Sequence, residues 1–237
     1  MKLCDAKILF VDDEPLLLKI FGQWLAGATP SRISTASDGL EALKLLAEND
    51  YDLVITDVNM PRMDGITLVR HVSEWRKRAP SIVFLSGFGN VDEREMYGLG
   101  VQSFLSKPMS RDEFIAAAER AVADRTELWK KPWQMPPRHS LCIEALDFSE
   151  SSVPHGVVVG CGGFSAPYSR AVALGKVNFE CLLTTSGVRL AGQAYVRWAS
   201  QVEGRIGVEF AYLEEACREP ILDEINRNDP QAFIPSR

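Results

Sequence analysis

Four short apolar segments in the first half of the chain end in side chains that could do phosphate or metal chemistry. The segments and their terminal groups are 7–13 with Asp12 and Asp13, 53–58 with Asp57 and then Asn59, 81–87 with Ser86, and 101–108 with Lys107. Apolar runs bounded by Gly, Pro or Asp are typical of buried strands, and a charged carboxylate is costly inside one. In open parallel α/β sheets, ligands bind where the carboxyl ends of the strands meet. The pattern predicts that these polar groups gather at one edge of a sheet.

Carboxylates, a hydroxyl and an ammonium group together suit phosphoryl transfer. Mg2+ prefers hard oxygen ligands, and clustered carboxylates repel one another without a cation. An ammonium can neutralise phosphoryl oxygens, and a hydroxyl can donate a hydrogen bond to one of them. Because positioning and charge neutralisation supply most of the catalysis in such reactions, few other groups are needed.

The ordered set resembles the receiver domain of bacterial two-component response regulators over roughly the first half of the chain. The resemblance implies Asp57 as the phosphoacceptor, Ser86 as the switch hydroxyl, Lys107 as the phosphate-binding group, and Asp12, Asp13, Asp57 and the backbone carbonyl of Asn59 as ligands of Mg2+. It also implies a histidine kinase as phosphoryl donor, a switch role for Phe104, and often a cis peptide before Pro108. The expected output surface comprises residues 91–99, Phe104 and residues 111–125, and a homodimer could form through the receiver.

Helical periodicity and capping residues alternate with the strand-like segments. The predicted helices begin at Glu14-Pro15 and cover 40–48, 65–78, 91–99 and 111–122. Strands that alternate with helices of this length indicate right-handed βαβ units. We therefore expect an α/β doubly wound, five-stranded parallel sheet of the flavodoxin-like kind, followed by a separate β-rich domain.

Composition sets the wider frame. A chain of 237 residues favours two domains, here predicted at 1–125 and 140–237 with a linker at 126–139. The sequence has neither an apolar run of about eighteen residues nor the apolar core of a signal peptide. Five scattered cysteines without C-x-x-C spacing fit a reducing cytoplasm, and we expect no membrane insertion. The net charge is −6 and neither half has a basic excess, so we expect no DNA-binding output.

The second half reads as a small antiparallel β-barrel. Strands are predicted at 141–148, 156–159, 176–183, 192–199 and 204–210, followed by a helix at 213–226 that Pro220 interrupts early. The glycine-rich segment 160–163 is assigned to a turn. Helix 111–122 is expected to run on into the linker, whose Trp129 and Trp133 are expected to dock on a domain rather than stay exposed.

Residues 192–210, GQAYVRWASQVEGRIGVEF, resemble the end of a PilZ domain, and residues 173–183 fit the middle of the same fold. Many PilZ domains bind cyclic di-GMP through R-x-x-x-R ahead of the barrel and [D/N]-x-S-x-x-G at its second strand. Here Arg138 has no second arginine four positions away, and the string from Asp147 to Ser149 ends in Ser152 instead of glycine. Paired guanidinium groups clamp phosphates, so we do not expect cyclic di-GMP to bind in the standard mode.

These observations define two hypotheses. In the first, the chain is a cytoplasmic response regulator, phosphorylated on Asp57, whose output is contact with an unidentified downstream protein through a PilZ-like domain. In the second, it is an effector that integrates phosphorylation with cyclic di-GMP binding at a nonstandard site. Neither makes the chain an independent enzyme, because no nucleophile–base pair or further metal constellation is present in the sequence.

Overall fold

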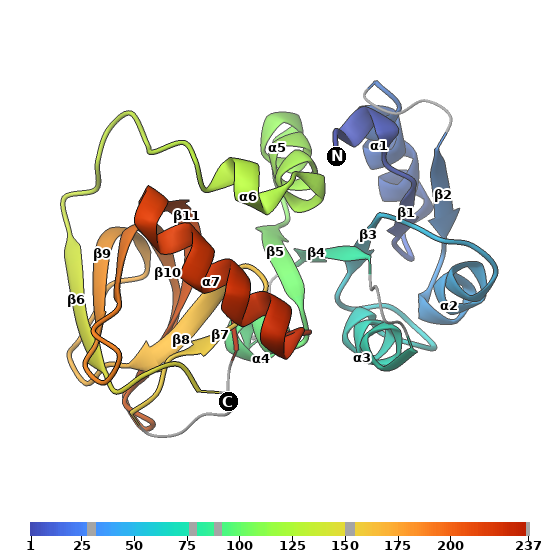
Figure 1. Ribbon diagram of the computed structural model, residues 1–237. Coiled ribbons are helices and arrows are strands. Elements are labelled where there is room, and N and C mark those ends of the chain that lie inside the picture. The colour runs from blue at the N-terminus through green and yellow to red at the C-terminus, as the bar shows by residue number, and fades with distance from the viewer. Residues whose placement is uncertain (28–31, 76–79, 88–91, 150–154, 236–237) are drawn as a thin grey trace. The chain divides into compact units, whose positions relative to one another are not determined.

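The computed structural model describes residues 1–27, 32–75, 80–87, 92–149 and 155–235, which Figure 1 traces. The ends of the helices predicted at 65–78 and 91–99 fall outside the described residues. The chain divides into two compact units, Met1–Val91 with Leu99–Ala123, and Asp92–Gly98 with Asp124–Arg237. Each unit contains a β-sheet of its own.

The first unit is built on a parallel sheet with the strand order β2-β1-β3-β4-β5. Its strands are β1 (Ile8–Val11), β2 (Ile33–Ala36), β3 (Leu53–Asp57), β4 (Ser81–Ser86) and β5 (Val101–Ser106). The predicted doubly wound sheet is confirmed, and four strands lie inside the predicted apolar segments. Strand β2 has no counterpart among those segments because its sequence, ISTA, is only partly buried and carries little apolar pattern.

Helices connect these strands and begin close to the predicted residues. They are α1 (Pro15–Ala26), α2 (Gly39–Glu48), α3 (Gly65–Trp75) and α5 (Arg111–Val122). Pro15 occupies the first position of α1, where its missing N–H costs nothing. The Asp38 carboxylate accepts a hydrogen bond from the Glu41 N–H and caps α2, and Ser110 and Glu113 form a capping box at the start of α5.

An aromatic cluster fills the space between the sheet and two of its helices. Phe21 on α1 stacks on Phe114 on α5 with ring centroids 5.0 Å apart, and both rings lie near Phe10 of β1. Helices α1 and α5 contact each other beside this cluster, whereas α2 and α3 contact each other. Strand β3 lies in the middle of the sheet with all its residues buried, so the residue at its end has a rigid support.

The second unit contains a six-stranded sheet with the order β6-β9-β10-β11-β8-β7, consistent with a small β-barrel (Figure 1). Its strands are β6 (Ser140–Ala145), β7 (Val158–Val159), β8 (Gly163–Pro167), β9 (Gly175–Leu183), β10 (Arg189–Ser200) and β11 (Arg205–Leu213). The strands pair antiparallel, as expected, except that β6 pairs with β9 in parallel. A parallel pairing needs a long connection, and the chain supplies one by forming β7 and β8 between the two strands.

Strand β8 was also unexpected, since Gly163 was assigned to a turn. Gly163 instead pairs with Glu209 on β11, and a Cβ at this glycine would collide with the carbonyl of Val208. The close approach of the two backbones therefore requires glycine inside the strand.

Two helical expectations are corrected. Helix α5 does not run on: Ala123 is extended, and Asp124 caps a separate short helix, α6 (Arg125–Leu128). Helix α7 (Glu215–Asn228) contains Pro220 without ending there. Proline removes one helical hydrogen bond, but the neighbouring Cys217 and Ile221 are 1% and 0% exposed in the core, and this packing holds the helix together.

The linker tryptophans dock within the second unit, as predicted. Trp129 is 2% exposed, and its ring meets that of Phe210 edge-on with centroids 5.3 Å apart. The backbone N–H of Trp133 donates a hydrogen bond to the Gln193 side chain at 2.6 Å. The ring centroids of Trp133 and Tyr195 lie 5.0 Å apart. The linker is thus anchored to β10 and β11 by aromatic contacts and by a hydrogen bond.

Candidate functional site

Asp57 is the last residue of the central strand β3, at the carboxyl edge of the parallel sheet. Asp57 is 6% exposed, and its Oδ2 accepts a hydrogen bond from the Asn59 backbone N–H at 2.7 Å. A Cβ at Gly65, the first residue of α3, would collide with the Asp57 carbonyl oxygen. The start of α3 therefore packs directly on the end of β3, and this contact fixes the backbone of Asp57.

Lys107 joins two carboxylates that are far apart in the sequence. Its Nζ lies 2.5 Å from Asp57 Oδ1 and 2.8 Å from Asp12 Oδ2. The Asp12 side chain is fully buried, and that of Lys107 is 18% exposed. Charge-assisted hydrogen bonds of this kind are stronger than neutral ones. The ends of β1, β3 and β5 thus converge on one cation, as the strand-end pattern predicts.

Burial and the ion pairs shift the pKa values of both Asp57 and Lys107. Burial raises the pKa of the Asp57 carboxyl above its ordinary value of 3.8, against the opposing effect of Lys107. Burial alone would lower the pKa of Lys107, but its hydrogen bonds and ion pairs with Asp12 and Asp57 outweigh burial and raise the pKa overall. Lys107 therefore remains a cation at neutral pH.

The other residues of the predicted site are placed less directly. Asp13 is exposed, Asn59 touches Asp57 through its backbone N–H, and the Ser86 hydroxyl donates to the Gly87 carbonyl at 2.9 Å. The structure thus brings Asp12, Asp57 and Lys107 into direct contact. The roles of Asp13, Asn59 and Ser86 stay predictions. The peptide before Pro108 is cis, as the resemblance suggested.

Sequence reasoning missed the residues that support the loop after Asp57, at positions 59–64. The buried Asp38 carboxylate forms an ion pair with Arg62, whose φ of 67° places it in the left-handed region. The Gly39 N–H donates to the Met63 carbonyl at 3.1 Å, and a Cβ at Gly39 would collide with Met63. The contacts of Asp38 and Gly39 with the loop could be found only from the fold, because the two segments are far apart in the sequence.

The first unit is thus a doubly wound α/β domain with two carboxylates and a lysine at the carboxyl edge of its sheet. Residues 8–119 match the family described as response regulator receiver domain. The N-terminal part of the chain is therefore a receiver domain. A receiver domain is a phosphoacceptor switch rather than an enzyme of the usual kind.

Several known proteins are similar to this chain over part of its length. The chain is 33% identical over 130 residues to the transcriptional regulatory protein GlrR of Escherichia coli K12, covering 54% of this chain and 29% of that protein. It is 33% identical over 174 residues to the uncharacterized transcriptional regulatory protein YesN of Bacillus subtilis, covering 70% and 45%. It is 34% identical over 108 residues to the sensor histidine kinase RcsC of Escherichia coli K12, covering 46% and 11%. The chain thus spans less than half the length of each of these relatives.

Solved structures similar to the chain include a receiver domain protein from Clostridium thermocellum and the receiver domain of NtrX from Brucella abortus. The first is 29% identical with a TM-score of 0.45, covering 49% of this chain and 94% of that one. The second is 29% identical with a TM-score of 0.45, covering 48% and 97%.

Receiver domains generally bind Mg2+ at their aspartate pocket, and the observed donors fit this ion. Asp12 and Asp57 already direct one carboxylate oxygen each at a single cation, the Lys107 ammonium. Within the described residues, no group of three His, Cys, Asp or Glu side chains could hold a metal. Mg2+ commonly keeps several waters and takes one or two carboxylates, so two converging oxygens meet its requirement.

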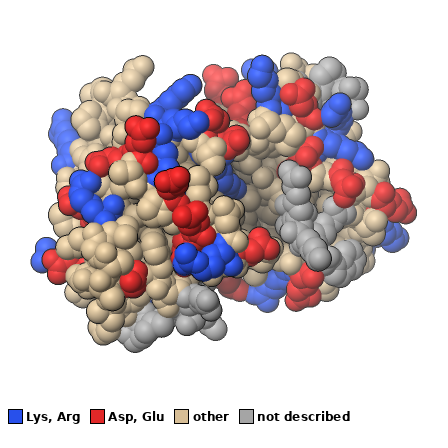
Figure 2. All heavy atoms as spheres, viewed as in Figure 1, with Lys and Arg blue, Asp and Glu red and all other residues tan. Residues whose placement is uncertain are grey.

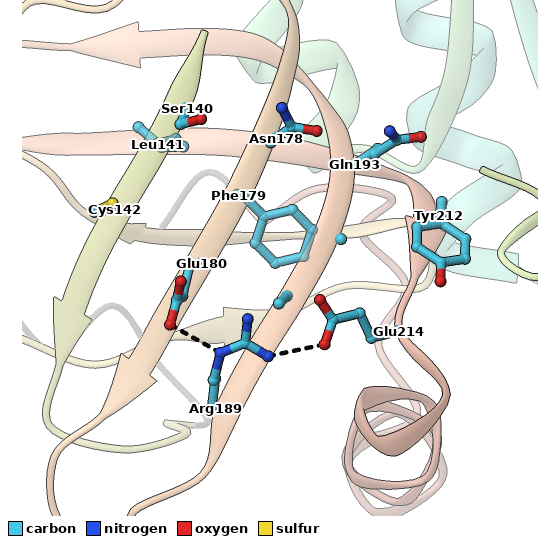
Figure 3. A pocket seen from close by; sticks show the side chains of 12 residues that line it. Ser140, Leu141, Cys142, Asn178, Phe179, Glu180, Arg189, Gln193, Tyr212 and Glu214 are labelled. Atoms are coloured by element: carbon cyan, nitrogen blue, oxygen red, sulfur yellow. Dashed lines mark hydrogen bonds and ion pairs between the residues drawn. The ribbon is translucent and has the colours of Figure 1, made fainter. Parts of the chain in front are cut away.

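The second unit has a hollow of about 320 Å3 over β6, β9 and β10 (Figure 3). Among its lining residues, Arg189 donates to Glu180 and to Glu214, each at 2.8 Å. These two hydrogen bonds raise the pKa of the arginine. Because both partners are acidic, the guanidinium charge is already neutralised, and this surface is poorly suited to an anionic ligand.

Charges of both signs are intermixed on the face shown in Figure 2. Within the described part of the chain, no helix combines the length and apolar character that crossing a membrane requires.

Proposed function

We propose that the chain is a response regulator of a two-component phosphorelay, phosphorylated on Asp57 by a histidine kinase with Mg2+. Its output would be protein–protein contact through the PilZ-like domain at 140–237. The observation that carries this proposal is the Lys107 ammonium, held between the Asp12 and Asp57 carboxylates at the end of β3. This arrangement keeps a nucleophilic carboxylate and a phosphate-binding cation within hydrogen-bonding distance.

The chemistry follows from these contacts. An oxygen of Asp57 forms the new bond to the phosphorus of the donor, and the donor group leaves with its bonding electrons. The Asn59 N–H holds Oδ2 and leaves the carboxylate with a fixed orientation. Lys107 then turns from the carboxylates to the phosphoryl oxygens and neutralises part of their charge.

Other groups complete the proposed site. Asp12 and Asp57, which already converge, would hold Mg2+, and the exposed Asp13 would turn toward them to complete the ligand set with the Asn59 carbonyl. When bound, the ion supplies additional neutralisation of the phosphoryl charge. The Ser86 hydroxyl, which now donates to the Gly87 carbonyl, can rotate to donate to a phosphoryl oxygen. Phe104 lies 5.6 Å from Phe84 between ring centroids, and we assign it the accompanying switch.

The PilZ-like assignment of the second domain is supported by how its signature residues pack. Trp198 lies on β10 and Gly207 on the paired strand β11, directly opposite in register. A Cβ at Gly207 would collide with the Trp198 indole, so the glycine of the Gly-Val-x-Phe string makes room for the tryptophan of the Val-x-Trp string. Helix α7 follows β11, in the order that the resemblance implies.

One observation favours the alternative, a cyclic di-GMP-responsive effector. In the sequence, no glycine follows Ser149 at the motif spacing, yet Gly156 lies against it: a Cβ at Gly156 would be 2.7 Å from the Ser149 Cβ. The Val157 N–H also donates to the Asp147 carbonyl at 2.9 Å. Asp, Ser and Gly thus meet in space, although the second arginine of the usual pair is missing from the sequence around Arg138. Calorimetric titration with cyclic di-GMP decides this alternative: binding supports it, and absence of heat at saturating protein removes it.

The main proposal is tested with the full chain, acetyl phosphate and Mg2+. Asp57→Ala should abolish phosphoryl uptake, because it removes the nucleophile. The matched control is Asp112→Ala, whose side chain is 98% exposed and lies away from strand ends in the first turn of α5. Labelling that persists in Asp57→Ala, or that is lost equally in both variants, would contradict the assignment.

A further inference from the structure

The irregular segment after α7, residues 229–235, is buried in a way that such segments seldom are. Asp229 ends α7 in the left-handed region with a φ of 43°. Phe233 and Ile234 then lie 3% and 0% exposed within the second unit. Loops normally run over the surface, because a buried irregular backbone must find partners for all its polar groups. We call residues 229–235 the anchor segment.

The anchor segment finds its backbone partners on the glycine-rich turn. The Cys161 N–H donates to the Ala232 carbonyl at 2.9 Å, and the Gly162 N–H donates to the Phe233 carbonyl at 3.0 Å. A Cβ at Gly160 would collide with the backbone of the anchor segment, and one at Gly162 would collide with the Phe233 ring. The glycines of this turn are therefore shaped to receive an extended segment with an aromatic side chain.

On its other side the anchor segment holds helix α4 (Glu93–Gly98), which belongs to the same compact unit. The N–H groups of Phe233 and Ile234 donate to the Tyr97 carbonyl at 3.0 and 3.3 Å. The Phe233 ring stacks on that of Tyr97 with centroids 6.0 Å apart, and the Arg125 guanidinium lies 4.4 Å from the Phe233 centroid. Tyr97 itself is 2% exposed.

Helix α4 has a second attachment to the same unit. The Arg94 guanidinium lies 4.9 Å from the ring of Trp198 on β10 and forms an ion pair with Glu203 in the turn after that strand. Yet α4 lies within residues 8–119, the part of the chain that matches the receiver family, and it follows β4, whose last residue is Ser86. The anchor segment therefore contacts α4, the helix that, among the described residues of 8–119, clusters with the second unit.

We propose that the turn 160–163 is an intramolecular binding site for the anchor segment, and that the docked segment latches α4 in a way that opposes phosphorylation of Asp57. The second clause rests on the proposed function. In the latched arrangement Lys107 is committed to both Asp12 and Asp57. A phosphoryl group on Asp57 draws Lys107 and the Ser86 hydroxyl to itself, and Ser86 ends β4, the strand that precedes α4 in the chain. By linkage, weakening the latch then favours phosphorylation, and phosphorylation weakens the latch by the same factor.

The latch is tested first without any phosphoryl donor, by hydrogen exchange of the full chain. Phe233→Ala removes the ring from the turn and from Tyr97, so amides of α4 should exchange roughly tenfold faster. The matched control is Gln231→Ala, an exposed residue of the same segment, which should leave α4 exchange unchanged. Amides of β1 and β3 report whether the fold is intact. Unchanged α4 exchange in Phe233→Ala, with the fold intact, would overturn the proposal.

A double-mutant cycle separates docking from general destabilisation. Gly162→Ala places a methyl group where the Phe233 ring lies, so it should release the anchor segment as Phe233→Ala does. In the Phe233→Ala background the ring is gone, so Gly162→Ala should add little to α4 exchange. Additive effects would show that the two residues act independently and would refute the binding site.

Coupling is then read with acetyl phosphate and Mg2+. Phe233→Ala should reach half-maximal labelling at an acetyl phosphate concentration several-fold below that of the unmodified chain, whereas Gln231→Ala should match the unmodified chain. If the unmodified chain never labels, the proposed function fails while the exchange cycle still decides the docking site. If it labels normally and Phe233→Ala shifts nothing, the coupling between latch and phosphorylation is refuted.

Discussion

Replacing Lys107 by methionine isolates the charge that joins the two carboxylates, because methionine keeps most of the aliphatic stem. The ammonium lies 2.5 Å from Asp57 and 2.8 Å from Asp12, and the Asp12 side chain is fully buried. Removing one partner from a buried ion pair costs about 3–5 kcal/mol, since the remaining charge is left without compensation. Because Lys107 is itself partly exposed, we expect the low end, about 3 kcal/mol.

Hydrogen exchange of β1 and β3 in the full chain measures this loss in the first unit by itself. In chelator at pH 7, a decrease of about 3 kcal/mol in the opening free energy accelerates exchange of the most protected amides roughly 100-fold. Asp57→Asn removes the repulsion between the Asp57 and Asp12 carboxylates. Lys107→Met should therefore lower the opening free energy less in an Asp57→Asn background than in the unmodified chain.

Magnesium provides an independent check of the same reasoning. An ion bound by Asp12 and Asp57 would take over the role of the missing ammonium, so added Mg2+ should slow exchange more in Lys107→Met than in the unmodified chain. Two results together would refute this role of Lys107. In chelator, Lys107→Met would exchange at the same rate as the unmodified chain, and its effect would be the same in the Asp57→Asn background.

Other predictions concern the same strand edge and its supports. Burial raises the pKa of Asp57, so the folded state disfavours the charged carboxylate, and Asp57→Asn should be more stable than the unmodified chain at pH 7. This difference in stability should disappear as the pH falls toward 3.8, where the carboxyl becomes protonated in both states. Urea titrations at several pH values measure it. Equal stability at all pH values would contradict this. Gly65→Ala should destabilise the first unit by about 1–3 kcal/mol and slow phosphoryl uptake, because its methyl group collides with the Asp57 carbonyl. Thermal unfolding measures the first effect and acetyl phosphate labelling the second. A variant unchanged in both would be inconsistent with tight packing between Gly65 and Asp57. Ser110→Ala breaks the capping box with Glu113 and should cost about 1 kcal/mol without slowing uptake; a change in uptake would mean that the start of α5 contributes to the site.

Much of the first unit could be predicted from local sequence because its strands are buried on both sides. Continuous apolar runs such as 53–58 and 81–87 mark central strands, and a parallel sheet then requires their polar ends to meet. The edge strand 33–36 lacks this signal and was not found. The contacts of Lys107 agree with the prediction that the strand-end polar groups meet at one edge of the sheet. Which carboxylates Lys107 contacts depends on side-chain geometry, which the spacing of residues in the sequence does not specify.

The second unit was less predictable because its pairings are nonlocal. The parallel pairing of β6 with β9 depends on how the chain crosses the sheet, which no short pattern encodes. The glycine-rich segment 160–163 looked like a turn, and its role as a partner of residues 229–235 appears only when distant segments come together. The ion pair of Arg62 with Asp38 was invisible for the same reason.

The central claim is that Asp57 is a phosphoacceptor, and locating the phosphoryl group tests it most directly. The full chain is incubated with acetyl phosphate and Mg2+, and its peptides are analysed by mass spectrometry after chemical trapping of acyl phosphates. We expect one phosphoryl group per chain, on the peptide that contains Asp57, and none in chelator. No uptake, or a phosphoryl group on any other residue, would contradict it.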